Sequence, residues 1–271
     1  WSASGQNYIT DAFSYWNLGA ASVWMRPGSS LSDWVLKSYY GRVNYSIDGK
    51  YLFNFNARYD GSSTFSKNNK WAFFPSGSFA WNMGSEQFMA DLTWISQFKW
   101  RVSYGLTGNQ AISPFQTLAR FSDVFTVMDG VPVNAIRPTA VANNDLTWET
   151  TAQLNLGTDI SFFDDRINVS VDLYRMVTYD LLFTVPLPQY SGYGGQLQNI
   201  GEVENKGIEL ALGGKILTGG LKWDTDLNVS ANRNKILKLP GGTEIRYGSG
   251  PGHMVGLGDT QVLREGHPVG S

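Results

Sequence analysis

Apolar and polar residues alternate along several long stretches of this chain. In KSYYGRVNYSI (37–47) the odd positions are mostly aromatic or aliphatic, and the even positions are mostly polar. After the turn residues Asp48 and Gly49, the stretch YLFNFNARYD (51–60) continues the alternation without a slip. A period of two predicts β-strands that have one apolar and one polar face.

The alternation recurs further along the chain and predicts eight strands in all. The other six stretches are 71–83, 97–107, 146–163, 166–185, 207–217 and 221–234. The stretch 71–83 is the least regular, because Pro75 cannot donate to a strand ladder and indicates an irregular start or a bulge. The expected fold class is all-β, with consecutive strands running up and down.

The length of the predicted strands favours a membrane barrel. They have about 10 to 20 residues, whereas strands of soluble proteins cluster near 5 to 6. Eleven residues at ~3.3 Å each, tilted by ~45°, span roughly 26 Å, which matches the ~25 Å apolar band of an outer-membrane barrel. The sequence therefore predicts part of a transmembrane antiparallel up-and-down β-barrel.

Short and long connectors alternate along the chain, as they do in such barrels. Periplasmic turns are short, so 48–50, 164–165 and 218–220 are expected on the periplasmic side. The connector 84–96 is expected there too and is long enough for a short helix. The long connectors, expected outside the cell, are 1–36, 61–70, 108–145, 186–199 and 238–271.

The polar positions of the strands are expected to face the barrel lumen. They include Asn54, Asn56, Arg58, Asp60 and Arg101. An eight-stranded barrel has an interior just wide enough for its own side chains. Side chains of this polarity suit a wide, wet lumen better, so we expect the eight strands to be part of a larger barrel.

Composition narrows the classes of partner. Charged residues make up 16% and aromatic residues 14% of the chain, there are 30 glycines and no cysteine, and the net charge is −2. A chain without a basic excess has no electrostatic footprint for nucleic acid, so that partner is not expected. No stretch approaches 18 consecutive apolar residues, which excludes a transmembrane helix.

The sequence offers no convincing catalytic, metal or cofactor site. His253 and His267 are the only histidines and lack carboxylates at ligand spacing, and the Gly-rich run 248–258 lacks the Gly-Lys-Ser/Thr of a phosphate loop. The pairs Asp224/Asp226 and Glu202/Glu204 are neighbours on one strand, whereas a glycosidase needs two carboxyl groups across a cleft. We expect a protein that is not an enzyme and binds no cofactor.

Several longer segments of the sequence resemble segments of the SusC/RagA family of TonB-dependent outer-membrane transporters of Bacteroidota. They are ARYDGSSTFSKNNKWAFFPSGSFAW, SEQFM, FKWRVSYGLTGNQAI, LTWETTAQLNLGTDISFFDDRINVSVDLYRMVTYDLL, NIGEVENKGIEL and EGHPVGS. They occur in the order and at the spacing of the family, from about Ser38 to the end of the chain.

The resemblance implies a barrel of about 22 strands with a plugged lumen, of which residues 1–271 would be a fragment supplying about eight strands. The plug domain and the C-terminal strands would lie outside this sequence. It further implies TonB-dependent import of oligosaccharides or oligopeptides through the outer membrane, with a SusD-like lipoprotein as the lid. The expected partners are that lipoprotein, the TonB complex, outer-membrane lipid, and a glycan or peptide substrate.

Residues of the long connectors are the candidates for contact with substrate or lid. Aromatic side chains can stack on sugars or grip peptide side chains, and amides can hydrogen-bond either ligand. The candidates are Tyr190, Tyr193, Phe121, Phe125, Asn109 and Gln110. Packing within the loops explains the aromatic residues equally well, and a strand end explains Asn109 and Gln110 better.

Two other functions remain compatible with the pattern. A passive porin or an adhesin would use the same strands without a plug domain. A soluble carbohydrate-binding or hydrolytic β-sandwich would need shorter strands in two packed sheets.

Overall fold

The computed structural model describes residues 4–8, 10, 12, 16–24, 29–242, 244–249 and 259–269. The chain forms two compact units, Trp1–Trp34 and Val35–Ser271. In the first unit, strands β1 (Gly5–Tyr8) and β2 (Ala21–Trp24) pair antiparallel, and the 3-10 turn η2 (Leu18–Ala20) precedes β2. This small hairpin lies within the segment 1–36, which the sequence pattern predicts as a connector.

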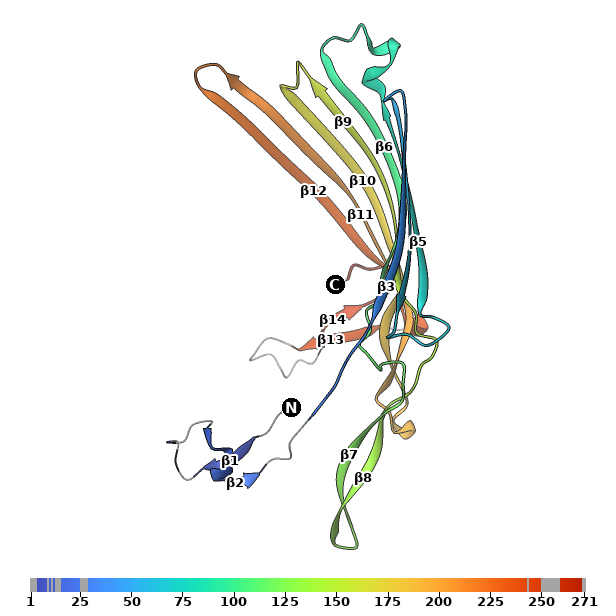
Figure 1. Cartoon of the computed structure of the whole chain (residues 1–271), viewed down its shortest axis with the longest axis vertical. Helices are drawn as coiled ribbons and strands as arrows, with labels where there is room; N and C mark the ends of the chain where they lie inside the picture. The colour runs from blue at the N-terminus through green and yellow to red at the C-terminus, as the bar shows by residue number, and fades with distance from the viewer. Residues whose placement is uncertain are drawn as a thin grey trace. The chain divides into compact units, whose positions relative to one another are not determined.

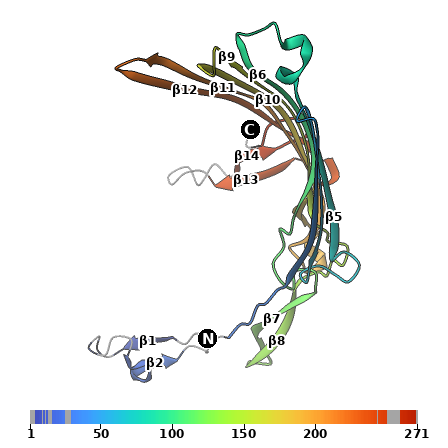
Figure 2. The same ribbon diagram turned by 45° about the horizontal axis from the view of Figure 1, so that its top comes forward.

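The second unit is built on one antiparallel sheet of eight strands (Figure 1). Their spatial order is β12-β11-β10-β9-β6-β5-β4-β3, and every strand is hydrogen-bonded to the strands next to it in this order. In Figure 2 the eight strands form a single curved wall. The strands are β3 (Leu36–Ile47), β4 (Tyr51–Ser62), β5 (Trp71–Asn82), β6 (Ile95–Asn109), β9 (Glu149–Phe162), β10 (Ile167–Pro186), β11 (Gly195–Thr218) and β12 (Lys222–Lys238).

All eight predicted strands are confirmed, as is the antiparallel up-and-down order. A β-sandwich is wrong for this chain, because the eight strands lie in one sheet whose apolar face is exposed. The largest error in a boundary is at β11, which begins at Gly195 instead of 207. Residues 195–206 pair with the end of β10 across an irregularity near Asp180, and their polar composition hides the alternation.

The predicted connector 108–145 contains a further hairpin. Strands β7 (Arg120–Met128) and β8 (Val131–Ala140) pair antiparallel and form a sheet of their own. Asp129 and Gly130 make the turn, both with positive φ (51° and 79°). An Asp-Gly pair between apolar runs is the usual signal of a two-residue hairpin turn, so this hairpin was detectable from the sequence.

The last predicted connector, 238–271, also contains strands. After the 3-10 turn η6 (Pro240–Gly242), strands β13 (Ile245–Ser249) and β14 (Asp259–Leu263) pair antiparallel. Beyond β14 the chain returns to β12, where the Ile236 amide donates to the His267 carbonyl and the Gly266 amide donates to the Ile236 carbonyl. The far edge of β12 is therefore partly engaged at this point.

Of the two irregularities predicted at Pro75, the start of β5 is irregular on one side and no bulge is formed. The pairing of β4 with β5 continues through Ala57 and Pro75 without a shift of register. On the other side of β5, pairing with β6 begins only at Ser76 and Gly105. The missing amide proton of Pro75 thus coincides with the end of the ladder on one side only.

The ends of the strands differ as the connector lengths predict. The turns near 48–50, 163–166 and 219–221 are short, and residues with positive φ such as Asp48 and Gly49 make the first of them. The connector between β5 and β6 holds two 3-10 turns, η3 (Met83–Ser85) and η4 (Gln87–Met89), where a short helix was expected; a third such turn, η5 (Gln189–Ser191), follows β10. Among the described residues, no helix is long and apolar enough to cross a membrane.

A small buried core lies at the opposite end of the sheet from the short turns. It joins β5 to the segments between β4 and β5, between β6 and β7, and between β8 and β9, and its members are Phe65, Phe74, Ile112, Leu146 and Trp148. The apolar face of the strands, in contrast, is largely uncovered, with Phe55, Leu173 and Trp223 about half exposed. Water would not favour so large an apolar surface, so this face needs an apolar environment outside the chain.

Aromatic rings gather at both ends of this apolar face. Near the long connectors, the Trp71 ring stacks on Tyr59 at 4.9 Å and on Tyr39 at 6.0 Å. Near the short turns, Tyr51 stacks on Trp81 at 6.0 Å and Trp94 stacks on Phe162 at 5.5 Å. Two such groups, separated by aliphatic residues, are typical of the aromatic girdles of a membrane barrel.

The apolar side chains on the exposed face form a belt across the sheet, and the level at which this apolar belt ends changes from strand to strand. Residues that pair directly share a face and form a row: Val43, Phe55, Gly77, Tyr104, Leu154, Arg175, Lys206 and Arg233. In this row the residues of β10, β11 and β12 are basic, so the apolar belt ends there on these strands. On β3 the row holds Val43, and the first charged residue on that face is Lys37, six residues further toward the long connectors. Six residues along a strand are ~20 Å, and the seven strand spacings from β3 to β12 are ~34 Å. If the end of the belt is level with the membrane surface, the strands are tilted from the membrane normal by about 30°, close to the ~35–45° of barrel strands.

Candidate functional site

The polar face of β3, β4 and β5 carries a connected set of hydrogen-bonded side chains. Direct pairing places Asn54 of β4 opposite Asn44 of β3, and Asn56 opposite Arg42. Asn56 Nδ2 donates to Asn54 Oδ1 at 2.6 Å and to Ser76 Oγ at 3.2 Å, and Arg42 Nε donates to Asn56 Oδ1 at 2.6 Å. The amides therefore hold one another in fixed orientations across β3, β4 and β5.

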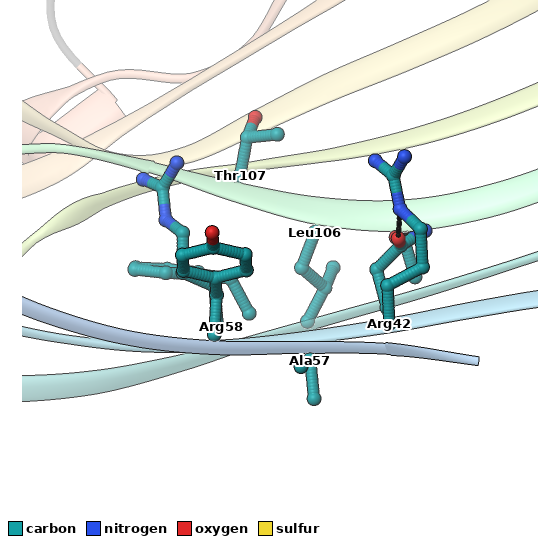
Figure 3. A pocket seen from close by; sticks show the side chains of 10 residues that line it. Arg42, Ala57, Arg58, Leu106 and Thr107 are labelled. Atoms are coloured by element: carbon teal, nitrogen blue, oxygen red, sulfur yellow. Dashed lines mark hydrogen bonds between the residues drawn. The ribbon is translucent and has the colours of Figure 1, made fainter.

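A cavity of about 510 Å³ opens beside these amides at the end of the sheet near the long connectors. Figure 3 shows Arg42, Arg58 and Thr107 pointing to one side of the strands, and Ala57 and Leu106 pointing to the other. The remaining lining residues are Tyr40, Gly41, Asn56, Phe74 and Ser76. Two guanidinium groups, an exposed phenol and a buried ring make this a surface that can bind both polar and flat groups.

The environment of the two arginines differs. Arg58 Nε donates to Asp60 Oδ2 at 2.6 Å, so its charge is balanced by a carboxylate. Asp60 lies on the same face but is only 1% exposed, so it does not meet open solvent. Arg42 donates to a neutral amide instead and has no carboxylate partner among the described residues, so a ligand can reach its positive charge.

Arg101 is the centre of a second polar group, further along the sheet. Its Nε and a terminal nitrogen donate to both oxygens of Asp159 at 2.8 and 2.9 Å, and the same terminal nitrogen donates to Asp172 at 3.1 Å. Ser170 Oγ donates to Asp159 at 2.8 Å. Gly157 leaves the space, since a Cβ there would lie 2.8 Å from the guanidinium. The group ties β6, β9 and β10 together across the polar face.

The six predicted contact residues lie on three separate segments. Asn109, at the end of β6, donates to Glu149 at 3.0 Å, and the side-chain oxygen of Gln110 is buried without a partner among the described residues. Phe121 and Phe125 lie on β7 and are more than 60% exposed. In the connector after β10, Tyr190 is exposed and Tyr193 is partly covered.

The cavity residues were largely absent from the predicted contacts. Arg42 could have been found, because it is a cation on the polar face of the first predicted strand. Phe74 could not, because the irregular pattern around Pro75 does not show that its ring lies on the face of Arg58, its direct partner.

The acidic pairs do not form a catalytic arrangement. Glu204 accepts from Arg175 at 2.6 Å and Glu202 lies 3.9 Å from Lys238, so both are neutralised by cations. Asp224 and Asp226 lie on the polar face of β12, opposite Lys215 and Gly213. In the described part of the chain, no three His, Cys, Asp or Glu residues form a group that could hold a metal ion. His253 and the run 250–258 lie outside the described residues.

Comparison with known proteins identifies the family. A family model described as "TonB dependent receptor-like, beta-barrel" matches residues 1–263. The chain is 49% identical over 270 residues to TonB-dependent receptor P3 of Formosa agariphila, which covers 99% of this chain and 27% of the relative. The chain belongs to the TonB-dependent receptor family.

Two further relatives place this TonB-dependent receptor chain in the SusC/RagA group. It is 37% identical over 243 residues to TonB-dependent receptor SusC of Bacteroides thetaiotaomicron, covering 87% of this chain and 24% of the relative. A solved structure described as that of the RagAB peptide transporter superposes with a TM-score of 0.79 at 28% identity, covering 93% of this chain and 27% of that one. The group is confirmed, as is location in the outer membrane of Bacteroidota.

The chain spans about a quarter of the length of these relatives. Its eight strands are one part of a TonB-dependent receptor barrel, and the exposed apolar face described above is what such a barrel presents to lipid.

Proposed function

We propose that the protein to which this chain belongs imports oligosaccharides or oligopeptides across the outer membrane, with energy supplied through TonB and with a SusD-like lipoprotein as its lid. The observation that carries the proposal is the match, in sequence and fold, to SusC and to the RagAB peptide transporter over about nine tenths of this chain. In this proposal residues 1–271 are a fragment of the barrel domain and carry no catalytic function.

The polar face of the sheet supports a wet lumen on its side. Asn54, Asn56, Arg58, Asp60 and Arg101 share this face. Their hydrogen bonds are made among themselves and with neighbouring polar side chains, so the wall stays polar without needing a packed core against it. A cargo passing this wall would meet amides, hydroxyls and the charge of Arg42, which is bonded to a neutral amide.

The long connectors support contact with cargo or lid. The β7–β8 hairpin presents Phe121, Phe125, Val127 and Ile136 on one face, each more than 60% exposed. Exposed aromatic and aliphatic side chains on a hairpin are typical of interaction surfaces. Further candidates are Tyr190 and Tyr193 in the connector after β10, Asn109 at the end of β6, and Gln110 directly after it.

Purification of the intact complex in mild detergent, followed by mass spectrometry, tests the cargo and the lid together. We expect a surface lipoprotein and either a sugar oligomer or a peptide to co-purify. Uptake of the identified ligand by cells should stop when the membrane potential is collapsed or when TonB is deleted. Uptake that continues under both conditions, with no lipoprotein bound, would establish a passive porin instead.

A pair of variants of the intact protein tests the hairpin. Phe121→Ala with Phe125→Ala should reduce ligand or lipoprotein binding about tenfold, because both rings lose their contact area. Ser122→Ala with Thr126→Ala is the matched control, since these residues lie on the other face of the same strand. Equal binding by the two double variants would exclude the hairpin face as a contact surface.

A further inference from the structure

The apolar face of β10, β11 and β12 becomes basic toward the long connectors. Arg175, Lys206, Arg233 and Lys235 make up this basic patch. Arg175 pairs directly with Lys206, and Lys206 pairs with Arg233, so the three lie in one row across three strands. Lys235 lies one position further on the same face, opposite Glu204.

The residues on the other side of this row are apolar. Leu173 lies two residues before Arg175 on β10, and Ile208 lies two residues after Lys206 on β11. Leu173 and Ile208 pair directly. On β12, Leu227 and Val229 lie on the same face and are about half exposed. The basic patch therefore begins where the apolar belt ends, at the extracellular boundary of the membrane.

Positive charge is in excess within the patch. Glu204 accepts from Arg175 at 2.6 Å and lies 3.4 Å from Lys206. The carboxylate is 8% exposed, whereas the two cations that cover it are 60% and 59% exposed. Arg233 and Lys235 are exposed and have no carboxylate partner in the described part of the chain. Four cations around one carboxylate leave a surplus of three positive charges.

The patch is a local feature rather than a property of the whole belt. At the corresponding end of β3, β4 and β5, the apolar face carries the stacked rings of Tyr39, Tyr59 and Trp71. Rings at this level suit any lipid, because they place an apolar body and a polar tip at the boundary. A cluster of exposed cations at the same level suits anionic headgroups in particular.

We propose that Arg175, Lys206, Arg233 and Lys235 bind the phosphate groups of a glycolipid in the outer leaflet. Guanidinium groups match phosphate with paired hydrogen bonds, and ammonium groups add point charges. The aliphatic side chains just below the patch would contact the acyl chains of the same molecule. The site depends on the outer-membrane location of the barrel and is independent of the cargo that it imports.

Binding of purified outer-leaflet glycolipid to the delipidated intact protein tests this site. The variant carries Arg175→Gln, Lys206→Gln, Arg233→Gln and Lys235→Gln, and we expect its affinity for the glycolipid to fall at least tenfold. The control carries Lys67→Gln, Lys99→Gln, Lys215→Gln and Lys222→Gln, which remove four positive charges from a connector and from the polar face. This control should bind within twofold of the unmodified protein.

The unmodified protein provides a second measurement that does not depend on how the variants fold. We expect enzymatically dephosphorylated glycolipid to bind at least tenfold more weakly, and inorganic phosphate alone to bind far more weakly than the glycolipid. Equal binding of the two glycolipid forms would overturn the proposal. An equal loss of glycolipid binding in the two quadruple variants, or tight binding of free phosphate, would also overturn it. So would a patch variant that loses a co-purifying protein but still binds the glycolipid.

Discussion

At the scale of single residues, neighbours along a strand of this protein experience opposite environments. Phe55 lies at the middle of β4 on the apolar face and is 57% exposed. Asn54, the preceding residue, lies on the polar face and donates to Asn44. A substitution that is severe at one of these positions should therefore be mild at the other.

Phe55→Arg and Asn54→Arg in the intact protein measure this difference directly. The first places a cation in the lipid near the midplane and should destabilise the barrel by about 2 to 4 kcal/mol. The second should cost less than about 1 kcal/mol, because the new guanidinium joins an already polar face. The measurement is the free energy of unfolding in lipid vesicles, and similar losses for both variants would contradict the assignment of the two faces.

A glycine on β6 shows how closely one ring is packed. A Cβ at Gly108 would run into the buried ring of Phe74, whereas a Cβ at Gly41 on β3 would meet nothing within 4 Å. Gly108→Ala should thus destabilise the protein by about 1 to 3 kcal/mol through overpacking. Gly41→Ala, the control, should stay within about 0.5 kcal/mol of the unmodified protein. Denaturant titration of both variants tests the prediction, which fails if they are equally stable.

At the scale of elements, one carboxylate joins the connector between β5 and β6 to two strands. Glu86 accepts from Lys50 at 2.9 Å, from the Tyr51 hydroxyl at 2.8 Å and from the Trp81 indole at 3.1 Å. These hydrogen bonds, Lys50 first, lower the pKa of Glu86 from its ordinary 4.5 to about 2. The same pair raises the pKa of Lys50. The short-turn end of the sheet is thus fastened by a group that stays ionised in acid.

The pH dependence of stability follows from this depressed pKa. The stabilisation from Glu86 is fully present above about pH 4.5 and is lost as the pH falls through about 2. Glu86→Gln should lower the thermal unfolding midpoint at pH 6, and the gap to the unmodified protein should narrow toward pH 2. Scanning calorimetry of both proteins between pH 2 and 6 gives the comparison. A gap that is constant over this range would contradict a stabilising role for the ionised carboxylate.

At the scale of the whole molecule, the eight strands form an open wall whose edge strands are β3 and β12. A membrane barrel must close, because unpaired backbone groups at a sheet edge are costly in lipid. Residues 264–269 engage β12 only near Ile236. We therefore expect strands beyond these eight to pair with both edges.

Expression of the 271-residue chain by itself should consequently give no stable barrel. On an unheated detergent gel we expect it to migrate as an unfolded chain, whereas the intact protein should run as a compact, heat-modifiable band. A compact band from the isolated chain would show that the eight strands can close among themselves.

The sequence by itself determined the eight long strands and their two faces, whereas it left the hairpins β1–β2, β7–β8 and β13–β14 within predicted connectors. The period-two alternation of long strands such as 51–60 and 221–234 is visible without any knowledge of their partners, because each strand lies between lipid and a polar interior. Connector lengths determined the order and direction of the strands in the same way. The segments that resemble the SusC/RagA family, in turn, identified the barrel as that of a TonB-dependent receptor.

The tertiary structure decided what lies side by side. The bonds of Arg101 with Asp159 and Asp172 join residues from three strands, and only the register shows that they meet. The same holds for the row of Arg175, Lys206 and Arg233, whose residues look like isolated charges along the chain. Period-two patterns fix the face of a residue, but its neighbours on that face depend on how far each strand slides against the next, and this register is set by pairing across the sheet.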